Sequence, residues 1–130
     1  MQFINSENFV DEAERAIRSL ENQRNDRGRT INVVSTSKIR NLLSMTSDIY
    51  NEVMLLESNE LGERLKGQIS YLRVRCIYEA GRDESVQAFI RESRLLDILP
   101  SISDRKDYLL FSRYMESLIA WHKYRHGKDA

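Results

Sequence analysis

Two histidines near the carboxyl end have a spacing that would let one helix present two metal ligands on one side. They are His122 and His126. The zinc-protease motif needs a carboxylate between its histidines, but here Lys123 and Arg125 stand between them. Two cations beside the candidate ligands disfavour a divalent ion. We therefore interpret His122 as a packed, hydrogen-bonded side chain and His126 as part of a polar helix end. We expect no metal and no other cofactor.

The other reactive groups do not form a catalytic pattern. Cys76 is the single cysteine, which excludes an internal disulfide, fits a reducing compartment and places the thiol on an apolar stripe where it would be inert. The acidic pairs Asp83 with Glu84 and Glu60 with Glu63 suit helix capping and solvated faces. Glycine motifs that cradle phosphates are absent from the sequence. The sequence therefore does not predict an enzyme.

Two basic residues stand where a helix start favours acids. Lys38 and Arg40 fall in the first turns of a helix predicted from Ser35 or Thr36 to about Glu57. One interpretation is an exposed position, where the cost is only a few tenths of a kcal/mol. The other is an anion site built from free backbone N–H groups and the two cations. The residues alone leave both open.

The segment that leads to Arg82 has two different faces when it is drawn as a helix. One is an apolar stripe typical of a core, made by Leu61, Leu65, Ile69, Leu72, Cys76 and Ala80. The other face carries Tyr71, Val74, Arg75 and Tyr78. An arginine between two tyrosines suits single-stranded nucleic acid, and it equally suits a protein interface. Arg73 borders the apolar stripe and could simply extend from it into water. Protein interface, RNA contact and plain surface remain three interpretations.

These residues must be positioned by helices, because no segment alternates apolar and polar residues for long enough to predict a sheet. The chain has 130 residues with 41% hydrophobic and 31% charged side chains, one proline and five glycines, which indicates one domain over residues 1–130. We predict an all-α, compact bundle of about five helices. Their expected ranges are about 6–22, 35–57, 58–81, 83–99 and 103–125. Residues 24–34 are predicted to form a flexible loop around Gly28.

The helix boundaries come from capping residues. Ser58 or Asn59 would cap the third helix, Asp83 the fourth, and Ser103 or Asp104 the fifth. In addition, Gly81 would end the third helix as a left-handed glycine, and Pro100 would end the fourth.

The last helix carries two apolar stripes. One is centred on Met115, and Leu110, Tyr114 and Trp121 lie nearly opposite it. This helix is therefore either central in the bundle or shared with a neighbouring molecule.

The charge balance excludes long-range attraction to nucleic acid or membrane surfaces. Basic and acidic residues number 20 each, so phosphate binding must come from a local patch. No apolar run approaches the roughly 18 residues of a membrane span, and no basic segment precedes an apolar one at the amino terminus. We expect a cytoplasmic protein without a membrane partner.

Three segments resemble the small helical subunit of type III-A CRISPR effector complexes, the Csm family. They are residues 36–43, 71–82 and 111–124, and the resemblance covers most of the chain from about Ser35 onward. It implies a compact helical protein without catalytic activity, whose copies stack head to tail beside the backbone and large subunits of the complex. It also implies contact with guide RNA and target RNA through basic residues, without reading sequence.

The resemblance assigns roles to residues of this chain. The RNA-binding positions that it implies are Lys38, Arg40, Arg73, Arg75 and Arg82. Candidates for subunit contacts are Tyr71, Tyr78, Tyr114 and Trp121. Two alternatives stay open: a helical adaptor that touches only protein, and a small metal-dependent nuclease that uses His122 and His126.

Overall fold

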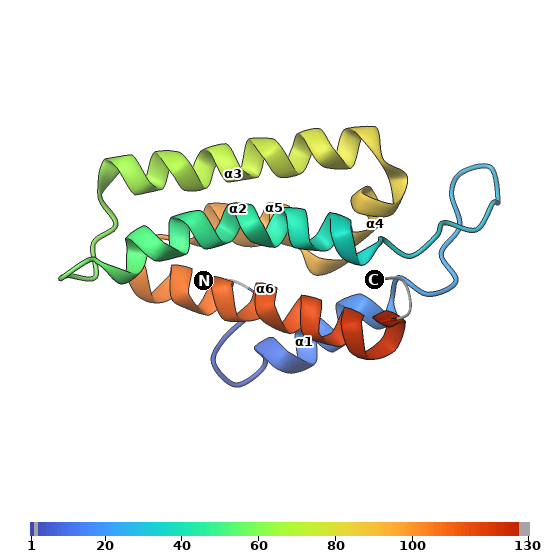
Figure 1. The fold of residues 1–130 in the computed structure, drawn as a ribbon, viewed down its shortest axis with the longest axis horizontal. Coiled ribbons are helices and arrows are strands. Elements are labelled where there is room, and N and C mark those ends of the chain that lie inside the picture. Colours follow the sequence, from blue (N-terminus) through green and yellow to red (C-terminus); the bar gives the residue numbers. More distant parts are fainter. Residues whose placement is uncertain (2, 128–130) are drawn as a thin grey trace.

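The computed structural model describes Met1 and residues 3–127, and these residues form helices and no strands. The helices are α1 (Phe9–Arg18), α2 (Thr36–Met54), α3 (Gly62–Arg82), α4 (Glu84–Ser93), α5 (Leu95–Ile98), the 3-10 helix η1 (Leu99–Ser101) and α6 (Arg105–His126). In Figure 1, α2 runs between α3 and α6, while α1 lies against α6. The prediction of an all-α bundle is confirmed. None of the helices in the described residues is both long and apolar enough to cross a membrane.

The core forms around α6, which contacts both α1 and α2. On the side of α6 centred on Met115, the side chains of Tyr108, Phe111, Met115 and Leu118 are all fully buried. Tyr114, from the second stripe, is buried as well. Of the two interpretations of α6, the structure supports a central helix within one chain.

Three predicted helix starts are confirmed. The Ser35 hydroxyl accepts a hydrogen bond from the Lys38 amide at 3.3 Å, and an Asp104 oxygen accepts one from the Asp107 amide at 2.8 Å. An Asp83 oxygen accepts the amide of Ser85 at 2.9 Å. Each side chain satisfies amides that have no partner within the helix.

The start and end of the third helix differ from the prediction. Neither Ser58 nor Asn59 caps α3, which begins at Gly62 after Leu61. Asn59 instead joins the α2–α3 loop to the start of α6, because its side-chain oxygen accepts the Lys106 amide at 3.0 Å. At the other end, Gly81 remains helical and is not among the described residues with positive φ, so α3 continues through Arg82.

The predicted fourth helix is broken in two. Arg94 has φ of 60° and lies between α4 and α5, although a non-glycine residue rarely takes this left-handed conformation. The break keeps Leu95 and Ile98 of α5 in the core, 1% and 0% exposed. Burial of these side chains offsets the local backbone strain.

The predicted loop has a defined path. Arg24 and Thr30 form an antiparallel bridge, and Gly28 at its tip has φ of 77°. Ile31 and Val34, which follow it, are buried against the bundle. The hairpin of residues 23–31 is therefore anchored at its carboxyl side, and its flexibility stays a prediction.

Candidate functional site

The two histidines lie in different surroundings. His122 is fully buried, and its Nε2 donates to the Val34 carbonyl at 2.7 Å while Nδ1 lies 3.4 Å from the Thr36 hydroxyl. His126 Nε2 lies 3.4 Å from a Glu21 oxygen. Within Met1 and residues 3–127, no three histidine, cysteine or acidic side chains gather in a metal-binding group. The interpretation of His122 as packed and hydrogen-bonded is confirmed.

The Cys76 thiol is only 3% exposed, and burial raises its pKa to about 11. The nucleophilic thiolate is therefore scarce near neutral pH. This thiol is a packing group of α3.

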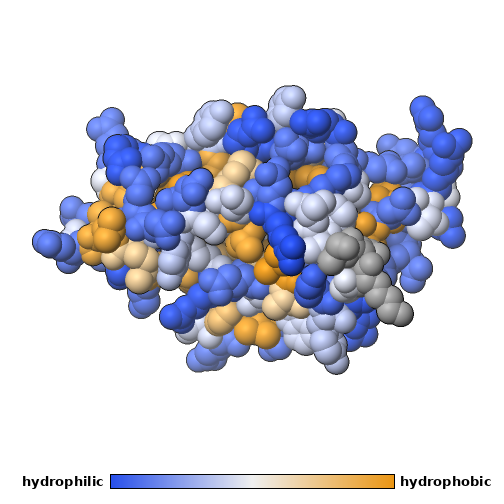
Figure 2. Space-filling view, in the orientation of Figure 1, coloured by the Kyte–Doolittle hydropathy of each residue, from blue (hydrophilic) through white to orange (hydrophobic). Residues whose placement is uncertain are grey.

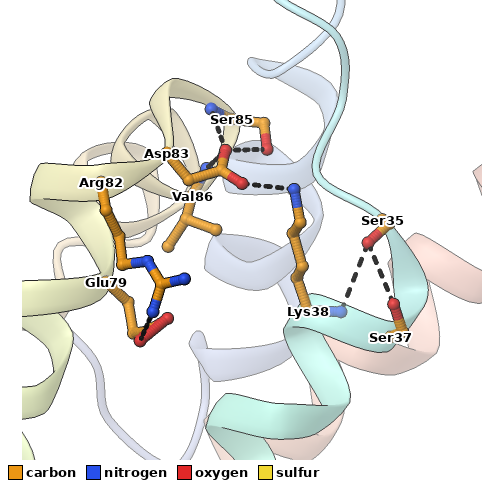
Figure 3. A network of polar contacts seen from close by, with 8 residues as sticks. All are labelled: Ser35, Ser37, Lys38, Glu79, Arg82, Asp83, Ser85 and Val86. Carbon is orange, nitrogen blue, oxygen red and sulfur yellow. Dashed lines mark hydrogen bonds and ion pairs between the residues drawn. The ribbon is translucent and has the colours of Figure 1, made fainter.

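Lys38 and Asp83 form an ion pair between the start of α2 and the α3–α4 corner. The contact holds the pKa of Asp83 well below its usual range, with the hydroxyl of Ser85 as the next largest cause. Asp83 also caps α4, so one carboxylate fixes the corner and orients the lysine (Figure 3). Because the Lys38 side chain is 49% exposed, its charge remains open to solvent.

Four residues at the end of α3, which we call the Arg75 cluster, place two arginines around one tyrosine. They are Arg75, Tyr78, Glu79 and Arg82. A Glu79 oxygen lies 3.6 Å from Arg75 Nη2 and 3.5 Å from Arg82 Nη1. The guanidinium carbons of Arg75 and Arg82 lie 5.1 and 5.5 Å from the centre of the Tyr78 ring. Glu79 and Tyr78 therefore hold both arginines at the same part of the surface.

Lys38 and Arg82 meet at one hollow of about 460 Å³ between α2 and the α3–α4 corner, which we call the polar hollow. Figure 3 shows both side chains reaching toward this space. Glu79 and Asp83 line it as well. Two cations face two carboxylates, so a phosphate that enters must compete with Glu79 and Asp83 for the cations.

A second hollow of about 540 Å³ extends along the groove between α2 and α3, and Tyr71 and Arg75 line it. Tyr71 is 63% exposed, and the apolar Met45 and Leu72 line the same groove. Arg75 therefore lies between the two hollows. It lines the more apolar groove beside Tyr71, and it pairs with Glu79, which lines the polar hollow.

The structure does not bring Arg40 and Arg73 into this group. Arg40 is exposed on α2 and forms no ion pair within the described part of the chain. Arg73 lines a different hollow, against Leu99 and Pro100 of η1. The two faces of α3 therefore separate Arg73 from Arg75, as their two-residue spacing requires.

The four candidates for subunit contacts differ in their exposure to solvent. Tyr71 and Tyr78 are exposed, at 63% and 54%. The expectation for Tyr114 is wrong, because this residue is 1% exposed and its hydroxyl donates to the Ser93 carbonyl at 2.8 Å. A side chain so buried cannot reach another subunit. Trp121 is half-buried and donates to the Val10 carbonyl at 3.0 Å, so it joins α6 to α1.

Sequence reasoning missed Glu79 and the pairing of Lys38 with Asp83. Glu79 follows Arg75 by four residues and precedes Arg82 by three, a spacing that could have revealed the shared carboxylate. The pairing of Lys38 with Asp83 joins residues 45 positions apart, and no local signal predicts it.

Comparisons with known proteins give consistent matches. The family profile described as Csm2 Type III-A matches residues 14–128. A protein of Streptococcus thermophilus named "CRISPR system Cms protein Csm2" is 40% identical over 129 residues, which are 99% of this chain and 100% of that protein. The protein of the same name from Mycobacterium tuberculosis (strain ATCC 25618 / H37Rv) is 41% identical over 97 residues, 74% of this chain and 78% of the relative. The one from Enterococcus italicus is 34% identical over 100 residues, 74% of this chain and 71% of the relative.

Proposed function

The chain belongs to the Csm2 family of type III-A CRISPR systems, as its resemblance to the small subunit predicted, and from this premise we propose its role. It is a non-catalytic subunit of a type III-A ribonucleoprotein complex in antiviral defence. Its copies stack with one another beside the backbone and large subunits in the cytoplasm. It contacts guide and target RNA through phosphates, without reading their sequence.

The observation that carries the RNA proposal is the convergence of Lys38 and Arg82 on the polar hollow, with Arg75 beside it. We call Lys38, Arg75 and Arg82 the basic strip. Lysine and arginine bind phosphates without regard to base identity. The two exposed tyrosines, Tyr71 and Tyr78, add rings on which unpaired bases can stack.

Overall neutrality is compatible with this role. A subunit that neighbouring proteins recruit into a complex does not need a long-range field to find RNA. It needs only a local basic surface once it is in place, and the basic strip with the exposed Arg40 supplies one.

The absence of catalysis is supported by the state of the reactive groups. Both ring nitrogens of His122 face partners in the core, and the raised pKa of Cys76 disfavours its thiolate. RNA cleavage is left to other subunits.

A helical adaptor that touches only protein is the second candidate. It is favoured by the exposed apolar side chains of α3, where Val74 is 54% and Ile77 is 50% exposed. Changing Val74 and Ile77 to Ser would then disrupt assembly, while no RNA would crosslink to the chain.

The test replaces the four candidate phosphate contacts with alanine: Lys38, Arg40, Arg75 and Arg82. The matched control removes the same charge from other surfaces, by alanine at Arg18, Lys106, Arg113 and Lys123. We expect the first variant alone to lower RNA retention by the assembled complex. A plot of the logarithm of the RNA-binding constant against the logarithm of the salt concentration has a negative slope. The magnitude of this slope should fall by about 0.7 for each single-strand phosphate contact that the variant loses. Circular dichroism checks the fold, and full RNA protection by the first variant would contradict the proposal.

A further inference from the structure

The hairpin of residues 23–31 concentrates arginines that the proposed RNA surface does not include. Arg24, Arg27 and Arg29 are all exposed. We propose that this hairpin is a second phosphate-binding element, which extends the RNA contact beyond the basic strip. This inference rests on the proposed function, because it assigns a further part of the chain to the same RNA.

Hydrogen bonds within the hairpin define the path of its backbone and hold the Arg24 side chain. The Asn25 side-chain oxygen accepts the amides of Arg27 at 2.9 Å and Arg29 at 3.1 Å. The amide of Gly28 donates to the Asn25 carbonyl at 2.9 Å, and Arg24 Nη1 donates to the Gly28 carbonyl at 3.0 Å. A backbone that is already ordered loses less conformational entropy when it binds a ligand.

The hairpin and α4 enclose a hollow of about 480 Å³ with a positive excess. The charged residues that line it are Arg24, Arg27, Arg29 and Arg91, with Asp26 and Glu84. Four guanidinium groups thus face two carboxylates, while the whole chain has a formal charge of zero. Arg91 already donates to the Gln23 side chain at 2.6 Å, whereas the side chains of Arg27 and Arg29 form no ion pair within the described residues. The side chains of Arg27 and Arg29 are therefore the groups available to a phosphate.

This hollow lies next to the polar hollow. The Asn25 side-chain nitrogen donates to Glu84 at 3.4 Å, and Glu84 directly follows Asp83, which pairs with Lys38. Figure 1 shows the hairpin projecting from the end of the bundle at which α2 begins and α3 ends. In Figure 2 the outermost part of this end is mostly hydrophilic. An RNA strand that contacts Lys38 and Arg82 can therefore continue along one side to the hairpin.

The composition of the hairpin favours RNA over a protein partner. Residues 24–30 contain no apolar side chain. The centre of a protein interface is usually built on buried aromatic or aliphatic anchors, which this segment lacks. Exposed arginines on an ordered polar turn instead match phosphate oxygens, which guanidinium groups bind through paired hydrogen bonds.

The test changes Arg27 and Arg29 to Ala, leaving Arg24 in place because it bonds within the hairpin. The control changes Lys106 and Arg113 to Ala, which removes the same charge from α6. Fluorescently labelled oligouridylate and an RNA of mixed sequence are titrated with each full-length protein at several salt concentrations. We expect the hairpin variant to bind both RNAs roughly tenfold more weakly, with a salt slope lower by about 1.4. A variant with Lys at both positions keeps the charges but loses the paired hydrogen bonds, so it should bind more tightly than the Ala variant and more weakly than the wild type.

The outcomes separate this inference from the proposed function. If the hairpin variant binds RNA as the control does, while alanine at Lys38, Arg40, Arg75 and Arg82 weakens binding, the hairpin inference is wrong and the proposed function stands. If neither variant weakens binding, both are wrong. Loss of complex assembly with unchanged RNA binding would assign the hairpin to a protein contact and overturn the inference. If the Lys variant and the Ala variant lose the same RNA affinity, the hairpin does not recognise phosphate by charge and the inference is wrong.

Discussion

Neutralising Glu79 should strengthen RNA binding, because this carboxylate occupies both arginines of the Arg75 cluster. A Glu79 oxygen lies 3.6 Å from Arg75 and 3.5 Å from Arg82. Under the proposed function, RNA phosphates therefore have to displace two ion pairs. Exposed ion pairs of this kind are each worth about 0.2–1 kcal/mol. Releasing two of them makes about 1 kcal/mol available to a phosphate, which is roughly a fivefold lower Kd for RNA.

The assay compares Glu79→Gln with Glu63→Gln, which makes the same charge change at the opposite end of α3. Fluorescence anisotropy with labelled oligouridylate at low salt gives both dissociation constants. The Glu63 variant controls for the added net charge. In a protein that already carries alanine at Arg75 and Arg82, Glu79→Gln should have no more effect than Glu63→Gln.

Two results would refute this reasoning. One is an equal change for the two glutamine variants, which would indicate net charge alone. The other is a gain for Glu79→Gln that persists without Arg75 and Arg82, which would show that the carboxylate acts through other groups.

Three further outcomes follow from single contacts. Asp83→Asn should keep the α4 cap but lose the ion pair with Lys38, lowering stability by up to about 1 kcal/mol at neutral pH. The pKa of Asp83 is lower in the folded protein than in the unfolded chain. The stability difference between the variant and the wild type should therefore be complete above the ordinary carboxyl pKa and be lost as pH falls through the lowered value. Thermal unfolding measured at several pH values tests this. Tyr114→Phe leaves the Ser93 carbonyl without its partner and should cost about 1–2 kcal/mol in urea unfolding, with RNA binding unchanged. Cys76 should react with a thiol reagent only at the rate of unfolding, and fast labelling of the native protein would contradict its burial.

Local signals were sufficient for most helices. The caps Ser35, Asp83 and Asp104 act on amides two or three residues away, so the sequence contains both partners. The outward face of α3 was also predictable, because a period of 3.6 separates Tyr71 and Tyr78 from the buried stripe.

Tertiary context decided the rest. The second stripe of α6 could face a neighbouring molecule or the same chain, and only the bundle shows that Tyr114 bonds to Ser93 of α4. The turn at Arg94 has neither glycine nor proline to mark it in the sequence. Arginine can take this strained conformation because burial of the next helix compensates for the cost. The polar hollow depends on Lys38 meeting Asp83 across 45 residues of sequence.

The most direct test of RNA contact is a protein–RNA crosslinking map of the intact type III-A complex that contains this chain. We predict crosslinked peptides that include Lys38, Arg75 and Arg82, with the same peptides for guides of unrelated sequence. Crosslinks that are absent from the chain, or confined to α1, would contradict an RNA-binding role for the basic strip.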